Sequence, residues 1–178
     1  METAARLFAE RGYHPTSVAD IVEHLGVGKG VFYWYFPSKD ELFVEILRDA
    51  HQGLRRRQQA AIADEPDPIT RIEQGIRASL EWFVGNRAYF TLFQQASTEE
   101  RFASVLRRNE EIAIADTVRH IKDGIVEGRI ADRDPEVLAQ AVVGVVEQLT
   151  RTYLFEREER VDEVTDSVVS FCLRGLAG

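Results

Sequence analysis

The sequence lacks several features that would place it in a common class of protein. It has one cysteine, Cys172, in 178 residues, so it forms no internal disulfide framework and is typical of a reducing cytoplasm. No run approaches the roughly 18 consecutive apolar residues of a membrane span, and the chain opens on no signal-peptide pattern. We therefore expect a cytoplasmic protein with no membrane partner.

Lysine is also scarce, and this bears on nucleic-acid binding. The chain has 19 Arg but only 3 Lys, and its formal net charge is −8. Phosphate contact normally needs a positive face, so the total charge opposes DNA binding. Residues 24–39, however, contain Lys29 and Lys39 and no acidic residue. The segment can therefore present a locally positive surface.

No stretch of period-2 alternation is long enough to predict a strand. Helical periodicity instead predicts an all-α protein of about nine helices. The helices are expected at 2–11, 17–25, 28–36, 39–62, 68–84, 88–96, 99–127, 135–156 and 161–176. The clearest break is Asp-Glu-Pro-Asp-Pro at 64–68, because its two prolines and three acids cannot propagate a helix.

The sequence has little that could build a catalytic or metal site. Four histidines (His14, His24, His51 and His120) show no metal-ligand spacing, and Cys172 has no cysteine partner. Gly26–Gly30 superficially resembles a phosphate-binding loop, but no strand precedes it and no Ser or Thr follows its lysine. No Ser/His/Asp or Cys/His arrangement is indicated. We expect no cofactor, no metal and no enzymatic activity.

The residues that indicate a function are concentrated in the stretch from Ser17 to Lys39. Two short helical patterns are separated by Gly26-Val27-Gly28, and the second is almost entirely aromatic from Phe32 to Phe36. Phe32 and Phe36 lie four residues apart and can share a core face, which leaves the other rings exposed. Two helices of about eight residues joined by a glycine-containing turn are typical of a helix-turn-helix.

The stretch from Leu7 to Leu42, LFAERGYHPTSVADIVEHLGVGKGVFYWYFPSKDEL, resembles the TetR family of bacterial transcriptional regulators. The matching motifs are F-AERGY at the end of the first helix, TSV at the start of the second, GV-KG in the turn, FYWYF in the third helix and PSK-EL at the start of the fourth. It implies a helix-turn-helix DNA-binding domain at 1–45. It also implies a divergent helical bundle at 46–178 for ligand binding and dimerisation, with helix 39–62 bridging the two.

The resemblance further implies which residues hold the phosphate backbone. Family members contact phosphates at the positions of Thr16 and Ser17, and Ser17 is independently expected to cap its helix with Asp20 in a capping box. Tyr33 and Lys39 match the tyrosine and lysine that clamp phosphates in the family. Such contacts position a protein on DNA and carry no sequence information.

Base reading is implied for the N-terminal end of the recognition helix, at Lys29, Gly30 and Val31. Lys29 has the chemistry to bind guanine O6 and N7, and Val31 can pack on a thymine methyl group. Trp34 and Tyr35 match positions that lie near bases and backbone in the family.

Two departures from the family pattern alter these expectations. The family usually has a further turn or two, often basic, before the equivalent of Glu2, and we expect this sequence to lack the minor-groove or phosphate contact that such a segment can make. The Ser or Thr common at positions 28 and 31 is here Gly28 and Val31. Losing both hydroxyls predicts a more apolar base readout.

The last two helices are apolar on more than one face and therefore need two packing partners. We expect a second copy of the chain to be one of them, which predicts a homodimer; the alternative is that both helices are central in a monomeric bundle. The interface is expected to contain Ala141, Gly144, Val145, Val168, Phe171 and Cys172.

Aromatic residues in the middle helices have two possible roles, as core packing or as the lining of an effector cavity. The effector alternative predicts a small apolar or aromatic molecule. Its predicted contacts are Trp82, Phe83, Tyr89, Phe90, Phe93, Phe102, Gln148 and Tyr153. The run Arg55-Arg56-Arg57 is interpreted as a solvated face, with a phosphate or ligand-carboxylate site as the alternative.

Together these features predict a ligand-responsive DNA-binding transcriptional regulator. A homodimeric repressor would bind a pseudo-palindromic double-stranded operator and be released by a small-molecule effector. The alternative is a helical small-molecule-binding or protein-interaction module that does not read DNA.

Overall fold

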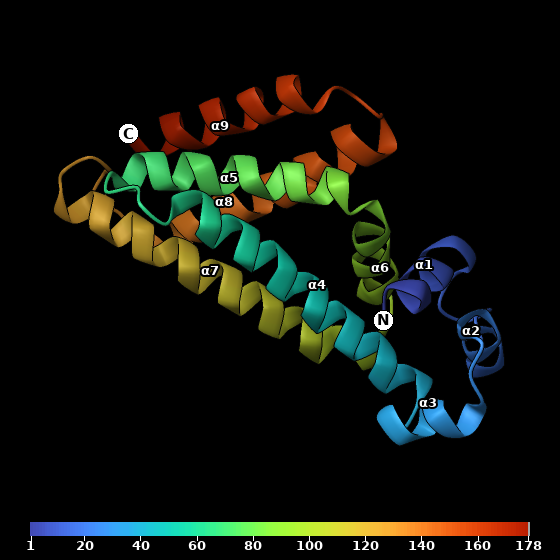
Figure 1. Cartoon of the computed structure of the whole chain (residues 1–178). Helices are drawn as coiled ribbons and strands as arrows, with labels where there is room; N and C mark the ends of the chain where they lie inside the picture. The colour runs from blue at the N-terminus through green and yellow to red at the C-terminus, as the bar shows by residue number, and fades with distance from the viewer. Residues whose placement is uncertain (178) are drawn as a thin grey trace. The chain divides into compact units, whose positions relative to one another are not determined.

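The computed structural model describes residues 1–177, and within that range it is helical and contains no strand (Figure 1). The prediction of an all-α chain is confirmed. The elements are α1 (Glu2–Arg11), α2 (Val18–Leu25), α3 (Lys29–Tyr35), α4 (Lys39–Ile62), α5 (Pro68–Gly85), α6 (Arg87–Ser97), η1 (Glu100–Phe102), α7 (Ala103–Val126), α8 (Pro135–Leu149), η2 (Thr150–Glu156) and α9 (Val161–Ala177).

Local sequence signals set the boundaries of the first helices. Gly12 ends α1 with a φ of 91°, and Gly26 ends α2 in the left-handed region at 65°, where a residue with a Cβ is disfavoured. Ser17 and Asp20 form the predicted capping box at the start of α2. The predicted helix 135–156 differs from the structure, because α8 gives way at Thr150 to the π-helical turns of η2.

The chain divides into two compact units. The N-terminal unit contains residues 1–52 and 86–109, and the C-terminal unit contains 53–85 and the described residues from 110 onward. The N-terminal unit thus includes α6, η1 and the first turns of α7 as well as the helix-turn-helix. The functional boundary expected between residues 45 and 46 stays a prediction.

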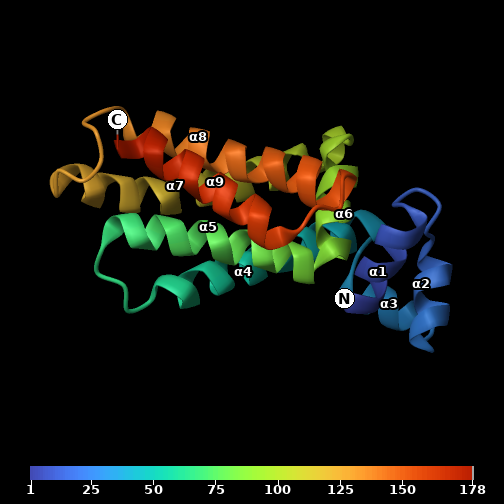
Figure 2. The same ribbon diagram turned by 90° about the horizontal axis from the view of Figure 1, so that it is seen from above.

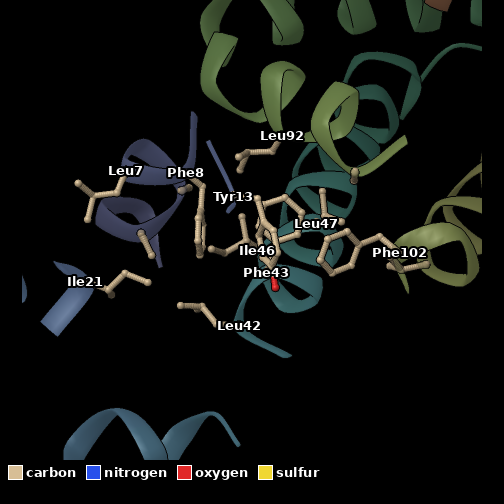
Figure 3. Packing of buried hydrophobic residues seen from close by; sticks show 14 of the residues in the cluster. Leu7, Phe8, Tyr13, Ile21, Leu42, Phe43, Ile46, Leu47, Leu92 and Phe102 are labelled. Atoms are coloured by element: carbon tan, nitrogen blue, oxygen red, sulfur yellow. The ribbon is translucent and has the colours of Figure 1, made fainter. Parts of the chain in front are cut away.

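Interlocking aromatic rings form the core of the N-terminal unit (Figure 3). The Tyr13 ring packs edge-on against Phe43 and Phe102, at centroid distances of 4.8 and 5.1 Å, and Phe8 contacts Phe43 at 5.1 Å. Polar contacts reinforce this packing: the Gln95 side-chain amide donates to the carbonyl of Phe8. The segment 86–109 therefore packs against α1 and α4, the helices that come before and after α2 and α3 in the chain.

The C-terminal unit has its own apolar core, formed by α5, α7, α8, η2 and α9. Figure 2 shows α9 lying beside α5 and α8. Cys172 on α9 is 5% exposed, and burial raises the pKa of its thiol to about 11, so the thiol stays protonated near neutral pH. None of the helices described in residues 1–177 is long and apolar enough to cross a membrane.

Candidate nucleic-acid-binding site

The outward face of α3 is an exposed aromatic surface. The exposed fractions are 78% for Trp34, 64% for Tyr35 and 55% for Tyr33. Phe32, in contrast, is 5% exposed in the core of the N-terminal unit, and Phe36 packs partly buried against the same core. As predicted from their spacing, the two phenylalanines pack α3 against the core, while the other three rings face solvent.

Small and basic residues occupy the beginning of the same helix. Gly28 is the N-cap residue, Lys29 and Gly30 are exposed, and Val31 is 47% exposed. Aromatic rings follow directly, with Trp34 and Tyr35 packed edge-on at a centroid distance of 4.6 Å. The surface therefore combines exposed aromatic rings with a cationic end, and a cationic side chain can bind guanine O6 and N7.

Thr16 and Ser17, the predicted phosphate contacts before α2, differ in their environments. Thr16 is fully buried, and its hydroxyl donates to the carbonyl of Gly12 at 2.8 Å. Ser17 is exposed, and its hydroxyl accepts from the backbone N–H of Asp20 at 3.1 Å and donates to the Asp20 carboxylate at 2.5 Å. A phosphate contact at Thr16 would thus have to come from its backbone, because its side chain is committed to the turn.

Lys39 begins α4 and points back to the turn between α1 and α2. Its ammonium group donates to the carbonyls of Tyr13 at 2.8 Å and Thr16 at 2.9 Å, with a longer contact of 3.4 Å to that of His14. The ammonium also lies 4.2 Å from the centroid of the Tyr13 ring. Desolvation lowers the pKa of Lys39, although neighbouring Asp40 opposes the shift.

Tyr13 itself is fixed by a polar contact on its other side. Its hydroxyl donates to the carboxylate of Asp40, which also pairs with Arg101 of η1 at 3.3 Å. Burial first, and then the bond to Asp40, raise the pKa of Tyr13 beyond the ordinary phenol range. The hydrogen bond from Tyr13 correspondingly lowers the pKa of Asp40. The turn at Tyr13 is therefore held from two directions.

The negative charge of the chain lies mainly outside the N-terminal unit. That unit has 9 basic and 10 acidic residues, for a net charge of −1, whereas the C-terminal unit carries the remaining −7. The charge objection to DNA binding therefore applies less to the unit that contains α3 than the chain total of −8 indicates.

The eight predicted effector contacts do not form one cluster within either unit. Tyr89, Phe90, Phe93 and Phe102 belong to the N-terminal unit, where Phe90 and Phe102 are 5% and 1% exposed. Their burial favours the core-packing alternative that the sequence left open.

The other four belong to the C-terminal unit. Trp82 and Phe83 are partly buried and pack edge-on against each other at 5.4 Å, and Tyr153 packs against the apolar core of that unit. Gln148 is exposed and donates to the hydroxyl of Thr152. An effector role for these four residues stays a prediction.

The predicted dimer residues divide into buried and exposed positions. Val168 and Cys172 are 0% and 5% exposed inside the protomer, whereas Phe171 is 66% exposed and Ala141 and Gly144 are also exposed. Val145 lies between these extremes.

Sequence reasoning missed Val137 on α8, which is 61% exposed. It lies one turn before Ala141, so helical spacing alone could have placed it on the same face.

The arginine run forms ion pairs within the C-terminal unit. Arg55 binds Asp116 through two contacts, at 2.5 and 3.1 Å, and Arg57 pairs with Glu81 at 2.8 Å. Arg56 is exposed. Two of the three side chains thus have protein carboxylates as partners, and neither alternative proposed for the run describes them fully. Among the residues described, no group of three or more His, Cys, Asp or Glu side chains is placed to hold a metal ion.

Known proteins similar to this chain are transcriptional regulators. The family model described as "Bacterial regulatory proteins, tetR family" matches residues 1–46, and that described as "Tetracyclin repressor-like, C-terminal domain" matches residues 65–176. The HTH-type transcriptional regulator YdgC of Bacillus subtilis is 23% identical over 99% of this chain and 90% of its own length.

The repressor KstR2 of Mycobacterium tuberculosis is 30% identical over 62% of this chain, and the aligned part spans 58% of KstR2. The solved structure described as the ketosteroid transcriptional regulator KstR2 of M. tuberculosis superposes with a TM-score of 0.75 at 26% identity, covering 99% of this chain and 92% of the other. The matched family models span the helix-turn-helix and most of the bundle, and the chain belongs to the TetR family of bacterial transcriptional regulators.

Proposed function

We propose that this protein is a ligand-responsive repressor that binds a pseudo-palindromic operator as a homodimer. The observation that carries the proposal is the outward face of α3, where Val31, Tyr33, Trp34 and Tyr35 are 47–78% exposed beside Lys29. Several large rings exposed together on one helix mark an interaction site. Two such helices would enter successive major grooves about 34–36 Å apart.

Roles on the DNA follow from chemistry and exposure. Lys29 and Val31 would read base edges, and Tyr33 would hold a phosphate, since hydroxyl groups are common phosphate partners. Ser17 would hold a phosphate by turning its hydroxyl proton away from the Asp20 carboxylate, to which it donates in this structure. Trp34, the most exposed ring, would pack against sugar or base surfaces.

Two variants separate base reading from phosphate holding. Tyr33→Phe removes only a hydroxyl and is expected to weaken binding to all sequences equally, by about 1.5–3 kcal/mol for each hydrogen bond lost to a charged group. Lys29→Ala should instead relax the preference at particular base pairs, at a cost of about 1–3 kcal/mol for the operator. Fluorescence anisotropy on operator and random duplexes measures both effects.

The operator duplex for these titrations would come from DNA upstream of the protein's own gene. Wild-type affinity should fall steeply with salt, because phosphate neutralisation releases counterions. Val126→Ala, at an 88% exposed site on α7 in the C-terminal unit, serves as the control and should leave both affinities unchanged. Binding that is absent at low ionic strength would favour the alternative, a helical module that does not read DNA.

Dimerisation is proposed through the exposed face of α8 and α9. Val137, Ala141 and Gly144 follow one another on α8 at spacings of four and three, and Phe171 projects from α9, which packs beside α8. Small residues at this spacing allow close helix approach, and an exposed phenylalanine provides an apolar anchor. Val168 and Cys172 would support the interface from inside the protomer, because their side chains are buried.

We propose that the effector binds within the C-terminal unit and is apolar with a few uncharged polar groups. Five buried side-chain atoms there have no hydrogen-bond partner: Arg71 Nε, Gln74 Oε1, His120 Nδ1, Thr150 Oγ1 and Thr165 Oγ1. The guanidinium charge of Arg71 is already paired with Asp123 at 3.0 Å, and the other four atoms belong to uncharged groups. Burial lowers the pKa of His120, so its imidazole is neutral at physiological pH. Neutral hydrogen-bonding groups in an apolar surrounding suit such a molecule. The description of KstR2 as a ketosteroid regulator favours the same ligand class.

Thr150→Val tests the effector proposal, because valine keeps the shape of threonine and removes the hydroxyl. A buried polar group without a partner costs about 1–3 kcal/mol, so the effector-free variant should unfold at equal or higher temperature than wild type. Small molecules that co-purify with wild-type protein, measured by native mass spectrometry, should be depleted in the variant.

Thr117→Val is the matched control, since the Thr117 hydroxyl donates to the carbonyl of Ala113 at 2.9 Å. It should leave the co-purified molecule in place. If the Thr150→Val protein retained as much of the co-purified molecule as wild type, the Thr150 hydroxyl would not belong to the effector site.

A further inference from the structure

The lysine that begins α4 is already fully engaged inside the N-terminal unit. An ammonium group has three N–H donors, and those of Lys39 face the carbonyls of Tyr13, His14 and Thr16. All three carbonyls belong to the turn that joins α1 to α2. Reaching out to a phosphate would require Lys39 to give up these bonds.

A cation is favoured at this turn. It follows the C-terminal end of α1, where unpaired carbonyls carry the negative end of the helix dipole. Pro15 contributes no N–H group, and the Thr16 hydroxyl already donates to Gly12. Lys39 therefore supplies the donors that the turn lacks.

The surroundings of Lys39 are built to keep it in this position. The Tyr13 ring lies 4.2 Å from its ammonium, and that ring is 4% exposed between Phe8, Phe43 and Phe102. The Tyr13 hydroxyl is bound by Asp40, the residue next to Lys39. Displacing the ammonium would also break a cation–π contact in a partly desolvated site.

The turn in question leads directly to Ser17, the exposed residue that caps α2 and is proposed to meet a phosphate. A residue that fixes the carbonyls at positions 13, 14 and 16 fixes the direction in which the chain enters α2. We infer that Lys39 is a positioning residue, which acts on DNA binding by locking the α1–α2 turn and makes no phosphate contact of its own. This inference rests on the proposed function.

Lys39→Arg distinguishes the two roles because it keeps the charge. The planar guanidinium group is a good bidentate phosphate ligand, but its donors fan out and cannot converge on three carbonyls of one turn as an ammonium does. A positioning role predicts that Lys39→Arg binds the operator duplex about tenfold more weakly or worse, as the loss of hydrogen bonds to a charged group implies. A phosphate role predicts that the variant binds as wild type does.

Lys39→Met adds a second readout, the slope of log K against log salt. Loss of a phosphate contact lowers the magnitude of this slope by about 1 for each protomer, whereas loss of positioning leaves it unchanged. Both variants would be titrated at a temperature at which circular dichroism shows them fully folded. A loss of binding then cannot result from unfolding of the variant. Lys122→Arg and Lys122→Met, at an exposed site in the C-terminal unit, are the matched controls.

We expect weaker binding by both Lys39 variants with the wild-type salt slope, and wild-type behaviour from both Lys122 variants. Wild-type affinity in Lys39→Arg, or a reduced slope in Lys39→Met, would overturn the inference while leaving the proposed function intact. Failure of the wild-type protein to bind DNA would instead defeat the proposed function, and the positioning role with it.

Discussion

Phe102→Ala is expected to cost the N-terminal unit about 3–5 kcal/mol of folding free energy, the range for removing a fully buried phenylalanine ring. Phe102 is 1% exposed and contacts Tyr13 at 5.1 Å and Phe43 at 4.7 Å. Because small domains are stable by only about 5–15 kcal/mol, the loss would remove much of the stability of the unit. Operator binding should fall with it, since the same core holds Phe32 of the recognition helix.

Urea denaturation followed by circular dichroism measures this loss, with Phe102→Leu as a milder variant that retains most of the buried volume. Trp34→Ala is the matched control, because it also removes a large ring, but from a site that is 78% exposed. It should change stability by about 0.5 kcal/mol or less while weakening DNA binding. If Phe102→Ala left the unfolding midpoint unchanged, Phe102 could not be a core residue of this unit.

Phe102 also shows where sequence reasoning reached its limit. Its spacing from neighbouring aromatic residues allowed either core packing or an effector cavity. Periodicity predicts which face of a helix is apolar, but it does not predict what that face contacts. The helix-turn-helix could be predicted from local signals, namely the cap at Ser17, the turn glycines and the stop at Pro37. The packing of residues 86–109 against helices some 50–100 positions earlier has no local signal.

Within the helix-turn-helix, which the sequence predicted well, the side-chain contacts of Lys39 could not be predicted. The family resemblance identified the residue and implied a phosphate contact, but residue type does not determine what a flexible side chain binds. The structure gives it three backbone carbonyls. Similarly, Thr16 was recognised as important, although its hydroxyl is buried in the turn.

In the last two helices, too, the apolar pattern of the sequence did not determine how the helices pack. Apolar residues on two faces of α9 predicted two partners, but the sequence could not say which face belongs to the protomer core. The structure buries Val168 and Cys172 and leaves Phe171 exposed. The exposed face is narrower than the set of residues predicted for it, and it includes Val137, which was not predicted.

Phe171→Asp is expected to convert the proposed homodimer to monomers and thereby to weaken operator binding. In a two-fold interface the same substitution appears twice, so two carboxylates without partners would enter one apolar contact, which is strongly unfavourable. Each monomer would then hold one half-site alone. Losing the linkage between two binding heads reduces affinity by a factor on the order of 10²–10⁴.

Analytical ultracentrifugation would report the mass of the Phe171→Asp variant, and anisotropy would report its operator affinity. The fold of the protomer should survive, because Phe171 is 66% exposed and contributes little to its core. Val126→Asp makes the same kind of change at an 88% exposed site on α7 and should remain dimeric with normal affinity. A Phe171→Asp protein that stays dimeric would place the interface elsewhere, whereas a monomer that still binds the full operator with wild-type affinity would show that DNA recognition does not require two linked heads.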